Sequence, residues 1–184
     1  MSAASPMATK TLAAPLTVEN SLGKIHALLA VQTVVIILGS INRLGTLTLG
    51  YVSANEFLRW VDFHNMLTLP LISLTAFYLL KKQIEGVAQG GSRHLLLNLA
   101  FIVGIYLLGA GYGAHEVTNY LHARFCLNDE SSGLCNIVIF NDDEFSHWVF
   151  FTGFVLINAA LMLLQVLFPR QAPLTARDAA LLAF

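Results

Sequence analysis

Apolar residues along the chain gather in four long runs, separated by shorter polar segments. A helix needs about 20 consecutive apolar residues to cross the hydrocarbon core of a bilayer, and each run approaches or exceeds that length. The expected spans are residues 24–41, 63–80, 94–117 and 147–168. Short connections between long helices favour antiparallel neighbours. The pattern therefore predicts an all-α integral membrane protein, built as a four-transmembrane-helix up-down bundle.

The segments outside these runs are expected to be tails. Residues 1–20 are small and polar, without the apolar middle of a cleavable signal, so we expect a loosely ordered cytoplasmic tail and an uncleaved first span. The transmembrane domain is expected to cover residues 21–170. Residues 171–184 are expected to form a second short cytoplasmic tail, with the composition of an amphipathic helix.

Two polar pairs read as helix starts of the capping-box type, in which a small polar residue is followed by Glu three positions later. Ser53 with Glu56 predicts that the second helix begins near Ala54. Asn141 with Glu144 predicts that the fourth helix begins there.

Composition strengthens the membrane prediction and removes one class of function. Hydrophobic residues make up 56% of the chain and charged residues only 11%, whereas a soluble domain carries about a quarter charged residues. The net charge is −1 and the sequence has no basic cluster, so nucleic acid is not an expected partner.

The distribution of Lys and Arg predicts the orientation, because cytoplasmic loops carry the excess of these residues. With a cytoplasmic amino terminus, seven lie inside and three outside. The three outside are Arg43, Arg59 and Arg124; the seven inside are Lys10, Lys24, Lys81, Lys82, Arg93, Arg170 and Arg177. We therefore expect both termini in the cytoplasm, the 118–146 loop outside it, and the inner (plasma) membrane of a bacterium as the location.

Cys126 and Cys135 both fall in that outer loop. Disulfides persist in oxidising compartments, so the two cysteines are expected to pair. A metal-binding or redox pair is the alternative, but the sequence lacks the C-x-x-C spacing of thioredoxin-like proteins.

Histidines and carboxylates collect where three of the spans meet the outer face. One histidine from each helix, His64, His115 and His147, predicts a three-ligand metal site with an open position, as in catalytic zinc sites. Residues expected around these ligands are Asn119, Asp143 and His122.

In that hypothesis a metal-bound water attacks a lipid or another amphiphile that enters from the membrane. The candidate general bases are Glu116 and Glu144. Zinc is the first metal considered. Iron is the second, since Glu144 and His147 form the Glu-x-x-His pair of di-iron bundles.

Other interpretations of the same residues stay open. The histidines can be interfacial side chains, and Glu144 can be a helix cap. Haem b is a further alternative, with an outer histidine pair and an inner pair of His26 and His94 in an electron-transfer protein. The chain can also be a non-enzymatic subunit of a larger membrane complex, and the small-residue face of Gly109 and Gly113 suits homo- or hetero-oligomer contacts.

The segments HEVTN (115–119) and DEFSH (143–147) resemble the paired histidine-and-acid motifs of small intramembrane metalloenzymes, the ceramidase/adiponectin-receptor-like hydrolases. The resemblance covers these two segments. It implies zinc held by histidines and an activated water that attacks an amide or ester bond of a lipid.

Overall fold

The computed structural model describes residues 21–86, 91–128, 131–169 and 174–182, and in that part of the chain the regular elements are helices. Four helical segments are long and apolar enough to cross a membrane: Leu22–Leu44, Trp60–Glu85, Ser92–Cys126 and Gly133–Leu167. Nearly the whole of each expected span lies within one of them. For the described residues, the prediction of an all-helical protein with four helices long and apolar enough to span a membrane is confirmed. The expected tail of residues 1–20 lies outside the described residues.

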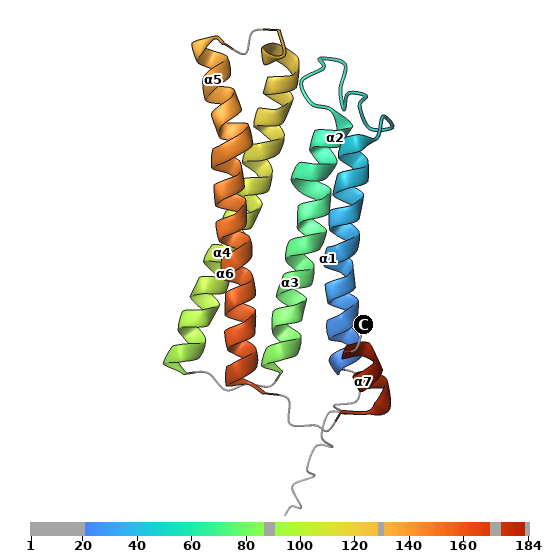
Figure 1. The fold of residues 1–184 in the computed structure, drawn as a ribbon, viewed down its shortest axis with the longest axis vertical. Coiled ribbons are helices and arrows are strands. Elements are labelled where there is room, and N and C mark those ends of the chain that lie inside the picture. The colour runs from blue at the N-terminus through green and yellow to red at the C-terminus, as the bar shows by residue number, and fades with distance from the viewer. Residues whose placement is uncertain (1–20, 87–90, 129–130, 170–173, 183–184) are drawn as a thin grey trace, which may run out of the picture.

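Three of the four long segments contain a turn of π-helix. The long helices run along the vertical axis of Figure 1, with the short α7 at the lower end. The first segment is the single helix α1 (Ser21–Leu44). The second joins α2 (Trp60–Phe63), the π turn η2 (His64–Thr68) and α3 (Leu69–Glu85). The third joins α4 (Ser92–Leu121) to η3 (His122–Cys126), and the fourth joins α5 (Gly133–Ile139), η4 (Phe140–Phe145) and α6 (Ser146–Leu167). A short helix, α7 (Ala176–Leu182), follows within the expected C-terminal tail.

The third and fourth segments are much longer than expected. Each has 35 residues, or about 52 Å at 1.5 Å per residue, against a hydrocarbon core of about 30 Å. Most of the expected 118–146 loop is therefore helix, and the true connection is short. It is closed by a disulfide between Cys126 and Cys135, with Cα atoms 5.4 Å apart, which confirms the predicted pair. The end of the bundle that carries this bond is called the disulfide end below.

The predicted helix start at Ser53 and Glu56 is wrong, because residues 45–59 fold back on themselves. A backbone bridge pairs Tyr51 with Arg59, and the helix begins only at Trp60. The Ser53 hydroxyl bonds the Asn55 side chain instead of capping a helix, and Glu56 has a positive φ of 58°. The loop is fastened to α4, where the Tyr120 hydroxyl donates to the Glu56 carbonyl.

The predicted start at Asn141 and Glu144 is also wrong, since both residues lie inside the continuous helix of the fourth segment. That helix begins at Gly133, and its cap is Ser132, whose hydroxyl accepts the Cys135 backbone N–H at 3.2 Å. Glu144 is an exposed side chain on a π turn.

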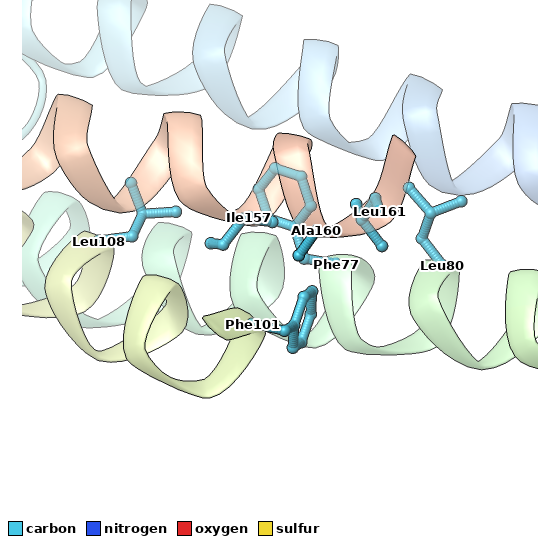
Figure 2. Packing of buried hydrophobic residues seen from close by; sticks show 7 residues of the cluster. All are labelled: Phe77, Leu80, Phe101, Leu108, Ile157, Ala160 and Leu161. Atoms are coloured by element: carbon cyan, nitrogen blue, oxygen red, sulfur yellow. The ribbon is translucent and has the colours of Figure 1, made fainter. Parts of the chain in front are cut away.

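The apolar core is formed by α3, α4 and α6. Figure 2 shows Phe101 and Leu108 meeting a group from α6 and α3, and Ile157 at its centre is fully buried. The remaining members are Phe77, Leu80, Ala160 and Leu161. Helix α1 runs beside this group and packs along α3, but none of its residues belongs to the buried cluster.

Glycines bring α4 and α6 into backbone contact. A Cβ atom on Gly111 would lie 2.6 Å from the Phe150 nitrogen, and one on Gly104 would lie 3.1 Å from the Ile157 nitrogen. Gly109 and Gly113, the expected small-residue face, are not part of this contact: a Cβ on Gly113 would meet nothing within 4 Å. The use of that face by a partner stays a prediction.

Candidate functional site

Buried charged residues gather at the disulfide end. Three carboxylates, Asp62, Glu116 and Asp142, are 1%, 4% and 1% exposed, and they come from α2, α4 and η4. Because a buried charge is costly unless it is paired, their partners define the site. We call these carboxylates and their arginine and histidine partners the carboxylate cluster.

Arg43, at the end of α1, connects two of the carboxylates. Its guanidinium donates to the Glu116 carboxylate and, at 2.5 Å, to the Asn119 side-chain oxygen. The same group lies 3.7 Å from Asp62. Planar guanidinium groups suit such multiple contacts because their donors are fixed in one plane. Arg43 therefore ties α1 to both α2 and α4.

Asp62 has a second cationic partner in the residue that precedes α2. Arg59 binds both of its oxygens, through Nε at 2.6 Å and Nη2 at 2.8 Å. Two arginines thus compensate this fully buried carboxylate.

Asp142 differs from the other two carboxylates in its neighbours among the described residues, which are neutral side chains and histidines. Thr118 donates to it at 3.2 Å and the Asn119 amide lies at 3.4 Å. His122 Nδ1 is 3.6 Å away and His115 Nε2 is 4.0 Å away. The two histidines are therefore the nearby side chains that could supply a positive charge to Asp142.

His115 and His147 form a close pair, with ring centroids 5.0 Å apart. In each ring Nδ1 is engaged: His147 Nδ1 donates to the Asp143 carbonyl at 2.6 Å, and His115 Nδ1 lies 3.2 Å from Glu116. A neutral imidazole with a donating Nδ1 presents Nε2 as an acceptor. The pair can therefore offer two acceptor nitrogens to a bound group.

The third expected metal ligand, His64, makes its contacts within its own helical segment and not with the histidine pair. His64 stacks on Trp60 at 5.6 Å and bonds Thr68 at 3.2 Å, both within its own segment. Within the ranges that the structure describes, no group of three or more His, Cys, Asp or Glu side chains is arranged to hold a metal ion. The zinc site of His64, His115 and His147 stays a prediction.

The other expected site residues fall into two groups. Glu116, Asn119 and His122 belong to the carboxylate cluster. The side chains of Asp143 and Glu144 are exposed, and Asp143 contributes only its carbonyl, to His147. The expected inner histidine His94 bonds Glu85 at 2.7 Å, and the haem alternative stays untested.

Sequence reasoning missed the central position of Arg43 and the burial of Asp142. Arg43 follows the first apolar run, and at that position a sequence pattern indicates only a residue that anchors the helix at the membrane interface. The sequence did contain a clue to its role. Three acidic residues lie on the other segments, and a charged residue in or beside a membrane-spanning helix usually pairs with one of opposite charge.

A cavity of about 380 Å³ adjoins the cluster between α1, α4 and α6. Its polar wall includes Arg43, His115, Glu116 and His147. A second cavity of about 260 Å³ shares four lining residues with it: Val35, Ile36, Tyr112 and Phe150. The two cavities therefore adjoin, and together they form a groove between α1 and α6, called the α1/α6 groove below.

Comparison of the chain with protein-family models, curated proteins and solved structures finds no match.

Proposed function

We propose that the protein binds an amphiphile from the membrane in the α1/α6 groove and holds its polar end against the carboxylate cluster. The observation that carries the proposal is the groove itself, which is polar at one end and mostly apolar along the rest. Ligand sites commonly combine apolar walls with a few convergent polar groups. Here the polar groups are Arg43 and the two histidines, while Leu69 and Phe151 belong to the apolar wall.

The polar end favours a particular ligand chemistry. The Arg43 side chain is 28% exposed and lines the cavity, so it has donors available to an acidic group. The histidine pair adds acceptors for a hydroxyl or a protonated acid. A fatty acid in its protonated form satisfies both requirements, because its carbonyl oxygen can accept from Arg43 and its hydroxyl can donate to a histidine, with its chain lying along the groove.

A metal-dependent hydrolase that acts on such an amphiphile is the second candidate. The observation in its favour is the anchoring of both Nδ1 atoms, because ligating histidines usually bond a carboxylate or carbonyl through their other nitrogen. His115 and His147 would hold the ion, which would supply an activated water. Glu116 would need to release Arg43 before it could accept a proton.

The proposed setting is an up-down bundle in the plasma membrane of a bacterium, with both termini cytoplasmic and the disulfide end outside. The excess of Lys and Arg on the opposite side and the Cys126–Cys135 bond support this orientation. A reporter enzyme fused after residue 184 tests it: activity of a cytoplasm-specific reporter is expected, and activity of an export-dependent one would reverse the orientation.

Photolabelling tests the groove. A photoreactive, alkyne-tagged fatty acid is crosslinked to the purified protein in detergent, with excess untagged fatty acid as competitor. Competable labelling is expected on α1 near Gly39 and on α6 near Phe151. The Gly39→Leu variant places a side chain into the cavity wall and is expected to remove it. The matched variant Gly113→Leu points into open space and is expected to retain it.

Loss of labelling in both glycine variants, or labelling that competitor does not reduce, would contradict the proposal. Elemental mass spectrometry and an absorption spectrum on the same samples separate the alternatives. Stoichiometric metal that disappears in His115→Ala and His147→Ala, and persists in His26→Ala, would favour the hydrolase. A Soret band would favour haem.

A further inference from the structure

A third cavity, with charged walls, lies at the opposite end of the bundle, where α3 ends and α4 begins. Its volume is about 600 Å³, and it shares no lining residue with the α1/α6 groove. Its polar wall is formed by Lys81, Lys82, Glu85 and His94. The amphiphile proposal uses none of these residues.

The charges in this wall do not cancel. Glu85 is buried and accepts from the buried Lys81, while His94 lies at 2.7 Å and Lys82 at 3.8 Å. One carboxylate therefore faces two lysines, and one positive charge remains even with a neutral histidine. An uncompensated positive charge beside a cavity favours an anionic ligand.

The rest of the cavity is apolar and aromatic. The Lys81 ammonium lies over the Phe101 ring at 5.6 Å, and the Lys82 ammonium lies over Tyr78 at 5.7 Å. Leu74 and Ile105 continue the apolar wall toward the middle of the bundle. A ligand that fills this cavity needs an apolar portion as well as a negative charge.

Asn98 adds a polar contact deeper in the cavity. It follows His94 by one helical turn, about 6 Å along the axis, and its buried side-chain oxygen has no hydrogen-bond partner. Buried polar atoms are normally satisfied, so this amide indicates a missing partner. Because the oxygen and NH₂ group of an amide exchange places on rotation, it can bond either a hydroxyl or an ester carbonyl.

We propose that this cavity binds one anionic phospholipid. The phosphate lies against Lys81 and Lys82, the glycerol ester region reaches Asn98, and an acyl chain follows Leu74, Phe101 and Ile105. Basic pockets between transmembrane helices recognise anionic lipid headgroups in this way. In the proposed orientation the cavity faces the cytoplasmic leaflet.

Native mass spectrometry of the full chain in detergent gives the test, with phosphatidylglycerol and phosphatidylcholine of the same acyl chains as probes. We expect phosphatidylglycerol to bind about fivefold more tightly, and Lys82→Gln to remove about that factor. The control is Arg93→Gln, which removes an exposed positive charge at the same end but outside the cavity wall. It is expected to leave the preference unchanged.

Two further arms keep the proposal testable if one variant folds poorly. Lys81→Gln/Glu85→Gln removes both partners of the buried pair and keeps the net charge of the wall at one positive charge, so the preference for phosphatidylglycerol is expected to persist. Asn98→Leu fills the deep end of the cavity and is expected to weaken phosphatidylglycerol binding. Equal binding of the two lipids, or an equal loss in Arg93→Gln and Lys82→Gln, would overturn the proposal. So would glycerol 3-phosphate binding as tightly as the lipid, because the ligand would then be a soluble phosphate ester.

Discussion

Helices α4 and α6 are joined by backbone contact, whereas α1 is held to its neighbours by polar side chains. Between α4 and α6, Gly104, Gly111 and Gly153 leave no room for a Cβ atom without movement. Along Leu22–Leu44, Val35 is the only buried residue. The α4/α6 contact therefore excludes any third group, and the α1 side has space for one.

The attachments of α1 are spread along its length. Gln32 and Ser73 exchange hydrogen bonds of 2.8 and 2.6 Å, and Asn42 donates to Asn65 at 2.7 Å. Arg43 completes the series at the disulfide end. In lipid, polar contacts hold helices together without close backbone approach. Helix α1 packs along α3 without the close backbone contact that joins α4 to α6, and the groove lies on the side of α1 that faces α6.

The largest effect is expected from removing Arg43, which fastens α1 to its neighbours at the disulfide end. Arg43→Met leaves the buried Glu116 carboxylate without its guanidinium, and we expect the free energy of unfolding to fall by about 4 kcal/mol. Photolabelling of the groove is expected to be lost as well. Unfolding in mixed detergent–SDS micelles measures the stability.

The double variant Arg43→Met/Glu116→Leu separates the ion pair from general damage. With both partners apolar and Asp62 still bound by Arg59, most of the stability is expected to return. A double variant as unstable as Arg43→Met would show that α1 depends on something other than this pair.

The next largest effect is expected in the close contact of α4 with α6. Gly153→Leu forces a side chain against the Leu108 backbone, and overpacking of this kind costs about 3 kcal/mol. The same substitution at Gly113 meets open space and is expected to change the unfolding free energy by less than about 0.5 kcal/mol. Similar losses at both positions would remove the distinction between the two helix contacts.

The smallest effect is expected at the middle of α1. Gln32→Leu removes the exchange of hydrogen bonds with Ser73, and polar contacts between membrane helices average about 0.6 kcal/mol. Melting of the variant by circular dichroism should show a small shift, with photolabelling retained. A loss as large as that of Arg43→Met would mean that the attachment of α1 is cooperative.

The apolar helices and the disulfide could be predicted because each depends on residues that are close together in the sequence. Runs of apolar residues decide which segments enter lipid, and loop placement brings Cys126 and Cys135 together. The two predicted helix starts were wrong because a small polar residue followed by Glu three positions later also occurs in a folded-back loop, at Ser53, and inside a helix, at Asn141.

The composition of the site could be predicted only in part. Glu116, His115 and His147 were expected to meet, and they do, but the side-chain directions downstream of His64, His122 and Phe140 depend on π turns. A π turn changes the angular position of every later residue, and simple helical spacing does not reveal it. Helical spacing alone also did not reveal that His64, the first residue of a π turn, contacts Trp60 and Thr68 of its own segment.

The pair formed by Arg43 and Glu116 has a consequence for biogenesis, because its two residues are 73 positions apart. Arg43 leaves the ribosome long before Glu116, and in the interval its carboxylate neighbour is Asp62, shared with Arg59. The amino-terminal half thus inserts with one surplus positive charge at the cluster, and the later half brings Glu116 and Asp142. The two halves therefore carry opposite net charge at the cluster, which favours their association, and the α1/α6 groove lies between a helix of each half.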